Sequence, residues 1–362
     1  MIAYHAQVAW KRTLAQAAAK TLGFEGSQVD PTAFQKELRT SHAALTFPLL
    51  KAFITQGVWS PARLRKAGYD VDCRCIHCGA PEDTLHHRLF ECSETSSLRE
   101  ELFKHGELQD VLQRTEARHL LLGFQLLPPR LAPLPDGVGY QQCETWTLSG
   151  APIEDVLRGE VFTDGSCFKE GPITWHRTGW SVIKISQDGI LLAWMRGTVG
   201  NALPQTSPAS EHVATLAAAA APGARVTQAN SDYKGLEHVE LLPSHVLYDR
   251  NQIYAGVKLE ICGRKPTGFS VAKVKGHCDP EAASTARDRY EAIGNGFADK
   301  IARAAADAQA RPSQEELQQW ESDKNLLGRY LTYVARALIK WPTLGPTIGK
   351  QVRPKLQETH AA

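Results

Sequence analysis

The chain has 362 residues, a length typical of two or three domains rather than one. With 43% hydrophobic and 22% charged residues, it has the composition of an ordinary soluble globular protein. The formal net charge of +2 excludes a strong overall basic field, so any binding of nucleic acid must come from local basic patches.

No segment of the sequence has the pattern of a membrane span or a secretory signal. The longest apolar run, around residues 217–221, is rich in alanine and stops at Pro222, so it is too short to cross a bilayer. The first 24 residues contain three basic residues and no acid, which faintly resembles a transit peptide, but an ordinary amphipathic helix is favoured. We therefore expect an intracellular protein of the nucleus or cytoplasm, not secreted and without a membrane partner.

Residues 1–72 are expected to be mostly helical. Asp30-Pro31 and Ser60-Pro61 each place a capping oxygen before a proline, which is a favourable helix start. Residues 98–127 are again expected to be helical and end in the apolar sequence LLLGFQLL. The region 1–127 is therefore interpreted as one helical part of the chain.

Four of the eight cysteines lie in one short segment of this part, CRCIHCGAPEDTLHHRLFEC. A disulfide framework would spread the cysteines along a small secreted chain, so their clustering indicates a metal site instead. Cys75 and Cys78 have the spacing that presents two thiolates to one zinc ion, and His87 and Cys92 would supply the second pair. Three sulfurs and one nitrogen make a closed tetrahedral site, which predicts a structural zinc ion.

Alternatives to this ligand set remain within the same segment. Cys73, His77 and His86 are spare candidate ligands, and free buried thiols are the weaker alternative. Over about residues 43–100 the sequence resembles the zinc-binding module found downstream of reverse transcriptases in non-long-terminal-repeat retroelements. That module reads CxxC, then Thr-x-x-His, then four residues and Cys, so Thr84 favours His87 as the ligand.

This resemblance also has implications for function and partners. It implies a zinc module that aids nucleic-acid binding, and a reverse transcriptase, encoded upstream or in trans, as a partner. The chain itself has no paired Asp-Asp after a Tyr, so we find no polymerase motif in it. The chain thus looks like the C-terminal part of a retroelement polyprotein or a host gene derived from one.

The sequence changes in character after a proline-rich stretch, PPRLAPLPDGVG, and residues 128–155 are expected to be an extended, fairly stiff linker. Beyond it, short apolar runs predict three strands and then an alternation of helices and strands. This order predicts an α/β fold, a mixed sheet with helices packed on it, over residues 156–310. The predicted strands are 160–163, 179–186, 189–199, 224–229 and 268–274, and the predicted helices start at Pro208 and Asp232.

The last part, residues 311–362, is expected to hold one long helix and a tail. Apolar residues recur at intervals of three and four over residues 313–341, which predicts one buried stripe on that helix. The residues of the stripe are Leu317, Trp320, Leu327, Leu331, Val334 and Leu338.

Four acids of the α/β region lie at the ends of predicted elements. Asp164 ends an apolar strand before Gly-Ser, and Asp232 ends another strand. Glu211 falls in the first turn of a helix capped by Ser207, and Asp299 falls in NGFAD at the start of the last helix. Taken singly, each acid has a structural explanation as a turn former or a partner of the helix dipole.

Taken together, these acids indicate metal binding. Four carboxylates cannot share a small site without cations, because like charges raise each other's pKa. Hard oxygen ligands suit Mg²⁺, and two such ions about 3.5–4 Å apart can clamp the attacking and leaving oxygens of a phosphodiester.

Five elements, DGS, SEHVA, NSD, VKGH and NGFAD, occur in this order between about residues 158 and 308. In this order they resemble ribonuclease H type 1, of the cellular and retroelement kind. The resemblance implies a five-stranded mixed sheet flanked by helices, and hydrolysis of the RNA strand of an RNA–DNA hybrid with two Mg²⁺ ions, with Mn²⁺ as a substitute.

The resemblance also implies a role for each acid. Asp164 would bridge both metal ions. Glu211 and Asp232 would hold the ion on the side of the attacking water, and Asp299 would help to hold the other. His277, in VKGH, would assist proton transfer or product release from a mobile loop, and the products would carry 5′-phosphate and 3′-hydroxyl ends.

Two features depart from that family. His277 and Asp299 are 22 residues apart, wider than is usual there, and Thr206-Ser207-Pro208 stands where an asparagine often contacts the hybrid. The basic residues that could meet phosphates are few, and a solvated face explains them equally well: Lys258, Arg264, Lys265, Lys273 and Lys275. The alternative function is a catalytically inactive nucleic-acid-binding relic of a retroelement polyprotein.

Overall fold

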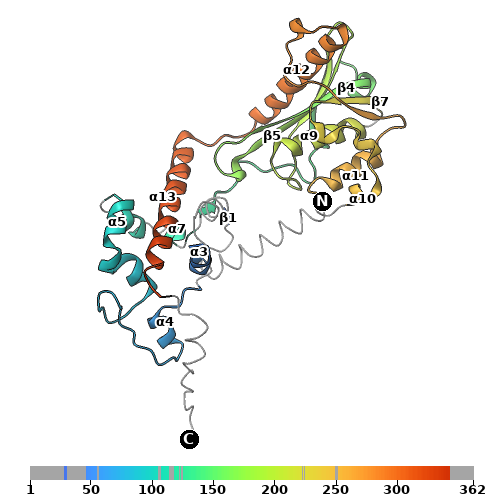
Figure 1. Ribbon diagram of the computed structural model, residues 1–362. Coiled ribbons are helices and arrows are strands. Elements are labelled where there is room, and N and C mark those ends of the chain that lie inside the picture. The colour runs from blue at the N-terminus through green and yellow to red at the C-terminus, as the bar shows by residue number, and fades with distance from the viewer. Residues whose placement is uncertain are drawn as a thin grey trace. The chain divides into compact units, whose positions relative to one another are not determined.

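The computed structural model describes residues 28–30, 46–54, 57–104, 107–113, 118–121, 123, 125–221, 223, 225–248 and 252–342. The chain forms two compact units (Figure 1), which we name the sheet unit (Met1–Gln28 and Leu127–Leu317) and the helical unit (Val29–Leu126 and Gln318–Ala362). The helix predicted to follow Asp30-Pro31 lies outside the described residues. No described helix has both the length and the apolar character to cross a membrane.

The sheet unit is built on a six-stranded mixed sheet with the strand order β3-β6-β5-β4-β7-β8. The four strands from β3 to β4 in this order are antiparallel neighbours, whereas β7 lies parallel to β4 and β8 parallel to β7. The predicted mixed sheet flanked by helices is confirmed, with one edge strand more than the five expected. The strands are β3 Cys143–Thr147, β4 Arg158–Phe168, β5 Arg177–Ile185, β6 Leu191–Gly197, β7 Arg225–Ser231 and β8 Ser270–Lys273.

The additional strand comes from residues 128–155, which were expected to be a linker. All five residues of β3 pair with β6, from Cys143 opposite Gly197 to Thr147 opposite Ala193, and the short helix α8 (Ile153–Val156) follows. A short edge strand such as CETWT is defined by the strand it pairs with more than by its own composition. This segment is therefore part of the sheet.

Helices pack on the sheet in two apolar clusters, because successive side chains of a strand point to opposite faces. Val161 lies in the cluster that contains residues of α9 (Ser207–Ala220), and Phe162 in the cluster that contains residues of α12 (Ala286–Asp307). Every residue from Ala209 to Ala219 is buried, since α9 packs both on the sheet and on α11 (Ala255–Arg264). Its many alanines have the small side chains that such close packing on two sides requires.

The prediction of a helix starting at Asp232 is wrong. The chain forms two 3-10 turns there, η5 (Lys234–Leu236) and η6 (Val239–Leu241), and then the single helical turn α10 (Ser244–Leu247). His238, between the two 3-10 turns, has a left-handed backbone with φ 56°, which cannot continue a helix.

The prediction that NGFAD opens the last helix of the sheet unit is also wrong. That helix, α12, starts much earlier, at Ala286, where Thr285 Oγ1 accepts a hydrogen bond from Asp288 N at 3.0 Å. The charged stretch between His277 and NGFAD, residues 278–294, therefore forms a loop, the 3-10 turn η7 (Pro280–Ala282) and the first turns of α12. Asp299 consequently lies in the middle of a long helix.

The helical unit consists of short elements around α13 (Gln314–Leu338). The helix start predicted at Ser60-Pro61 is confirmed, because Ser60 Oγ accepts a hydrogen bond from Arg63 N at 3.3 Å. The region 98–127, expected to be helical, contains three short helices and a strand. In chain order the elements are β1 Gln28–Asp30, α3 Thr46–Ile54, α4 Pro61–Lys66, η1 His87–Glu91, η2 Ser93–Thr95, α5 Ser96–Leu102, α6 Glu107–Gln113, α7 Arg118–Leu121 and β2 Gln125–Leu127, of which β1 and β2 pair.

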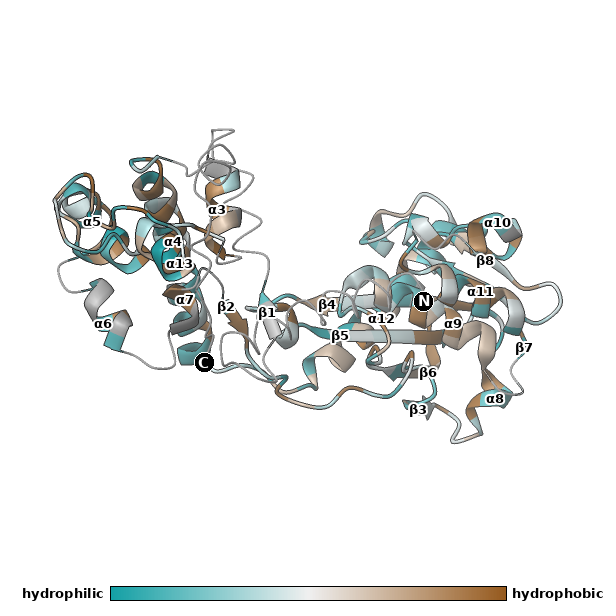
Figure 2. Cartoon of the chain, turned by 90° about the horizontal axis from the view of Figure 1, so that it is seen from below, coloured by the Kyte–Doolittle hydropathy of each residue, from teal (hydrophilic) through white to brown (hydrophobic). Residues whose placement is uncertain are grey.

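Helix α13 supplies the core of this unit. Its predicted apolar stripe is buried from Trp320 to Leu338, and only Leu317 in the first turn stays partly exposed. Hydrophilic and hydrophobic residues are both visible on α13 in Figure 2, as an amphipathic helix requires. Its buried residues share one cluster with Leu50 and Leu89, so this helix and the cysteine-rich region form one compact unit.

Candidate metal centres

Three carboxylates of the sheet unit meet at one place, which we name the acid group. Asp164 lies within β4, Asp232 directly follows β7, and Glu211 lies on α9. Each offers an oxygen atom, and these atoms lie within 4.8 Å of one another. Because β4 and β7 are parallel and Phe162 is in register with Asn230, the two aspartates, each two residues further on, come side by side.

Glu211 reaches this place because α9 approaches β4 very closely at Gly165. A Cβ atom on Gly165 would overlap the backbone nitrogen of Glu211, so a larger residue would push the helix away. The N-cap of α9 is Thr206, one residue before the expected Ser207, and its Oγ1 accepts a hydrogen bond from Ala209 N at 3.4 Å. Glu211 therefore lies just past the first turn, not within it as predicted, and it is buried.

The electrostatics of the acid group oppose full ionisation in the metal-free protein. Burial, together with the charges of Asp232 and Asp299, raises the pKa of Asp164 to about 6, although hydrogen bonds with Glu211 and from Gly165 N (2.7 Å) act in the opposite direction. Burial and the negative charge of Asp164 raise the pKa of Glu211 well above its usual range. A bound cation would remove much of this repulsion, so the group is suited to one.

The fourth predicted acid and the predicted histidine lie outside the acid group. Asp299 is partly exposed on α12, with its Oδ1 3.5 Å from a guanidinium nitrogen of Arg303. Its charge still raises the pKa of Asp164, so it lies within the field of the site. His277 is exposed in the loop after β8, with a left-handed backbone of φ 53°.

Further residues support the carboxylates and were not predicted as members of the site. Asn295 on α12 is buried and donates from Nδ2 to Asp232 Oδ2 at 3.4 Å, and its own Oδ1 has no hydrogen-bond partner among the described residues. Ser231 Oγ donates to Glu211 Oε2 at 3.4 Å. Gly276 packs so closely on Asp232 that a Cβ atom there would overlap the carboxylate.

Part of this support was visible in the sequence. Asn295 belongs to NGFAD and Gly276 to VKGH, so both lie inside motifs that marked the site. Their contacts with Asp232 could not be read from the motifs, because the contacts depend on how α12 and the loop after β8 return to the sheet.

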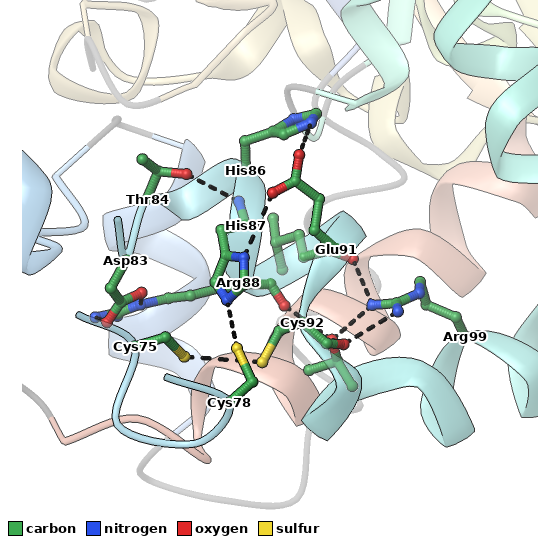
Figure 3. Close-up of polar contacts among 12 residues, drawn as sticks. Cys75, Cys78, Asp83, Thr84, His86, His87, Arg88, Glu91, Cys92 and Arg99 are labelled. Carbon is green, nitrogen blue, oxygen red and sulfur yellow. Dashed lines mark hydrogen bonds and ion pairs between the residues drawn. The ribbon is translucent and has the colours of Figure 1, made fainter. Parts of the chain in front are cut away.

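The four predicted zinc ligands of the helical unit form a second group, which we name the cysteine group. Cys75, Cys78, His87 and Cys92 each place a sulfur or ring nitrogen within 4.8 Å of the others. Cys75 Sγ lies 3.8 Å from Cys92 Sγ, and Cys78 Sγ lies 3.2 Å from His87 Nε2 (Figure 3). Three sulfurs and one imidazole nitrogen at these separations fit the donor set of a tetrahedral zinc site.

Local turns and hydrogen bonds hold the cysteine group in place. Cys75 N donates to Ala80 O at 2.8 Å and Gly79 N donates to Cys75 O at 2.9 Å, a tight turn in which Gly79 has the left-handed φ of 75°. The other ring nitrogen of His87, Nδ1, lies 3.4 Å from Glu91 Oε2 (Figure 3). This contact leaves Nε2 to face the sulfurs, as is usual for a histidine that binds a metal.

The environments of the thiols differ. Burial alone would raise the pKa of Cys75, but the backbone N–H groups of Cys78 and His77 donate to its sulfur, and the net effect lowers that pKa to about 6. Burial raises the pKa of Cys92 to about 12. Trp341, just after α13, packs with both sulfurs in one buried apolar cluster, so the end of the chain's last described helix shields the site.

The alternative ligands have other neighbours and are not members of the cysteine group. Cys73 Sγ lies 3.7 Å from Arg65 Nη1, His77 Nε2 lies 2.9 Å from Lys340 O, and His86 Nε2 lies 3.5 Å from Glu91 Oε1. The geometry therefore favours the ligand set that the spacing predicted.

Neither a family model nor a curated protein matches the chain. Among solved structures, it is similar to RNase H1 from the halophilic archaeon Halobacterium salinarum NRC-1, with 20% identity, a TM-score of 0.27, and coverage of 42% of this chain and 99% of that one. It is similar to LC9-RNase H1, a type 1 RNase H with the type 2 active-site motif, with 16% identity, a TM-score of 0.29, and coverage of 45% and 80%. It is also similar to LC11-RNase H1 in complex with an RNA/DNA hybrid, with 15% identity, a TM-score of 0.24, and coverage of 41% and 96%.

Proposed function

We propose that the sheet unit is an endoribonuclease that hydrolyses the RNA strand of RNA–DNA hybrids with two Mg²⁺ ions, which Mn²⁺ can replace. The observation that carries the proposal is the meeting of Asp164, Glu211 and Asp232 from three separate elements within 4.8 Å. The five motifs that resemble ribonuclease H, in order along the same unit, support it.

The acid group has the properties that such a reaction needs. Divalent ions, when bound, would stabilise the developing charge at phosphorus and activate a water molecule. Asp164 interacts with the other three acids, which makes it the candidate to be shared by both ions. Glu211 and Asp232 would hold the ion on the side of the attacking water, and Asp299 would help to hold the other.

The neighbours of the acid group orient it before any ion binds. Asn295 Nδ2 contacts Asp232 and Ser231 Oγ contacts Glu211, so two of the carboxylates are held by hydrogen bonds. Gly165 N holds Oδ1 of Asp164. These contacts reduce the reorganisation that metal binding would otherwise require.

The proposed substrate follows from the chemistry of the attack. A water molecule activated by metal needs no 2′-hydroxyl as nucleophile, so the products carry 5′-phosphate and 3′-hydroxyl ends. A site that senses a 2′-hydroxyl on one strand and deoxyribose on the other prefers the hybrid to either homoduplex. We therefore expect cutting of the RNA strand in hybrids, little cutting of double-stranded RNA and none of double-stranded DNA.

For the helical unit we propose one structural zinc ion on Cys75, Cys78, His87 and Cys92, in a module that aids nucleic-acid binding. The donor set of three sulfurs and one imidazole nitrogen and the contact of His87 with Glu91 support the zinc ion. The proposal of a reverse transcriptase as partner rests on the resemblance of this segment alone.

The test is end-group analysis of products from three matched duplexes, namely hybrid, double-stranded RNA and double-stranded DNA, with Mg²⁺ and then with EDTA. We expect cutting of the hybrid alone, only with the metal, and 5′-phosphate ends. Cyclic phosphate ends, or equal cutting of double-stranded RNA, would contradict the proposal.

Two observations favour the second candidate function, that of a nucleic-acid-binding protein without turnover. His277 is exposed outside the acid group, and Asp299 faces Arg303 at 3.5 Å. Tight binding of hybrid with no cutting of any duplex would support this function instead.

A further inference from the structure

A second region of the sheet unit combines buried polar groups with a pocket whose lining includes none of the three carboxylates of the acid group. The pocket has a volume of about 320 Å³ and lies where the proline-rich stretch 130–135 crosses the start of β5. Its polar lining includes Arg130, His176, Arg177 and Gln309. None of the described residues that line it is acidic.

Arg130 is the unusual residue of this pocket. It is half-buried, and among the described residues its side chain forms one hydrogen bond, from Nη2 to His176 O at 2.9 Å. Its Nε is buried without a partner, and no carboxylate among the described residues forms an ion pair with it. A guanidinium removed from water without an acid is costly, and burial accordingly lowers the pKa of Arg130.

Other lining residues share this lack of partners. Thr174 Oγ1 and Arg177 Nε are both buried without a hydrogen-bond partner among the described residues. The two acids near Arg177, Glu170 at 2.9 Å and Asp307 at 3.5 Å, are engaged with that arginine and do not line the pocket. Among the described residues, no acid therefore forms an ion pair that compensates the charge of Arg130.

His176 lies in the electrostatic field of Arg130. Burial lowers its pKa, and the positive charges of Lys169 and Arg130 lower it further. Its Nδ1 faces Gln205 O at 3.3 Å, so the neutral ring donates there. Lys169 and Arg130 thus act on a neutral histidine that lines the pocket, and none of the described lining residues is acidic. The potential inside the pocket is therefore positive.

We infer that this pocket binds a phosphate monoester, the terminal phosphate of a nucleotide, through Arg130. A guanidinium without an acid partner matches the acceptor oxygens of a phosphate. The volume exceeds that of a bare phosphate and suits a small organic ligand. The proline-rich stretch with Leu131 gives one apolar wall for the body of such a ligand. The inference does not depend on the proposed nuclease activity.

The fold explains why the pocket persists. Trp175 Nε1 donates to Pro129 O at 3.2 Å, and Arg130 holds the carbonyl of the next residue, His176, so two bonds fasten the proline-rich stretch over the start of β5. Prolines keep the stretch extended, which leaves its backbone unable to fold into the pocket.

The experiment is calorimetric titration of the full zinc-loaded chain with adenosine 5′-monophosphate or adenosine, in buffer without added divalent ions. The absence of Mg²⁺ keeps the acid group from contributing, because its carboxylates repel phosphate. We expect the monophosphate to bind and adenosine not to bind. Arg130→Gln should weaken binding about tenfold or more, Arg130→Lys should lie between, and Arg158→Gln, an exposed arginine outside the pocket, should match the wild type.

A second pair of probes distinguishes the source of the phosphate. A short strand with a 5′-phosphate that binds more tightly than the free nucleotide, in a manner that depends on Arg130, identifies a strand end, and the reverse order identifies a free nucleotide. If Arg130→Gln does not fold, Arg130→Lys takes its place and should weaken binding several-fold. No binding of the monophosphate to the wild type, equal binding in the pocket variants, or equal binding of the strand with a 5′-hydroxyl would overturn the inference.

Discussion

The two candidate metal centres are built in opposite ways. The ligands of the cysteine group all lie between Cys75 and Cys92, within a few local turns. The carboxylates of the acid group come from β4, α9 and the end of β7, which only the assembled sheet brings together. The ligands of the cysteine group are therefore brought together by their proximity in the chain, and those of the acid group by the topology of the sheet.

The difference has a consequence for stability. Two ligands of the cysteine group, Cys75 and Cys92, pack with Trp341 in a small apolar cluster, so we expect the metal to contribute to the folding of these turns. The acid group rests on a large core that includes Trp180 and Val213, and it opposes folding through repulsion of its own charges. We therefore expect zinc to stabilise the fold of the helical unit. In contrast, Mg²⁺ should be needed for the activity of the sheet unit but not for its folding.

The largest effect expected is on catalysis. Asp164→Asn should lower hybrid cleavage by about 100-fold or more, because it weakens the sites for both ions at once. It should not unfold the protein, since removal of one charge from the acid group relieves repulsion. Cleavage rates and circular dichroism measure the two effects, with Asp188→Asn in an exposed turn as the control. Full activity in Asp164→Asn would remove this residue from the mechanism.

The next effect separates the two centres. Cys78→Ser should lose the zinc ion, about one per chain by elemental analysis, and lower the melting temperature of the helical unit by several degrees, since 1 kcal/mol corresponds to roughly 2–4 °C in a domain of about 150 residues. Cleavage by the sheet unit should survive in part, because that unit has its own core. The exposed thiol of Cys278 provides the control, Cys278→Ser. A native protein without zinc would contradict the assignment of the cysteine group.

A smaller effect is expected at Asn295. Asn295→Ala removes the hydrogen bond to Asp232, and loss of such a supporting contact at a metal site costs about 10-fold in activity. The loss should shrink at high Mg²⁺ concentration, because the variant still has all its carboxylates. Asn201→Ala, at an exposed amide of the same unit, should leave the rate unchanged. A loss that is independent of Mg²⁺ concentration would indicate a structural role for Asn295.

The smallest effect concerns pH and the metal-free protein. The folded-state pKa of Asp164, about 6, is raised above its usual value of 3.8, so the folded protein holds this proton more tightly than the unfolded chain. Its contribution to stability therefore falls as pH rises from about 4 to 6 and stays low above that.

His212 acts in the opposite direction in the same range, because burial lowers its pKa to about 4. The comparison of Asp164→Asn with the wild type reports the titration of Asp164 together with its effect on Glu211, whose pKa the charge of Asp164 raises. The stability advantage of the variant, measured by urea unfolding in EDTA, should grow from pH 4 to 6 and reach roughly 1–3 kcal/mol. An advantage that does not change with pH would contradict the raised pKa.

The same contrast between local and assembled structure explains what the sequence could predict. All four members of the cysteine group were predicted, because CxxC and His-x4-Cys are local patterns. Asp164, Glu211 and Asp232 were predicted to converge and do so, since their strands and helix carry clear apolar patterns. Their roles in metal binding and catalysis stay predictions.

The sequence predictions are wrong in two situations. In one, an element forms only because it pairs with another strand; in the other, the residue that caps a helix lies in a stretch without a recognisable helical pattern. Strand β3 forms because it pairs with the edge of β6, and the sequence CETWT alone does not predict a strand. The start of α12 was misplaced because Thr285, the true cap, stands in a charged stretch without apolar periodicity. As a result the position of Asp299 within the helix, and the contact of Asn295 with Asp232, could not be predicted.

If the acid group is a site for divalent cations, the zinc-loaded full chain binds Mn²⁺ there. Electron paramagnetic resonance counts the free ion during a titration at pH 7.5, with Asp164→Asn and the control Asp188→Asn measured beside the wild type. We expect the wild type and Asp188→Asn to bind Mn²⁺ alike, and Asp164→Asn to bind it at least about tenfold more weakly. Equal binding by all three proteins, or no binding by the wild type, would contradict this expectation.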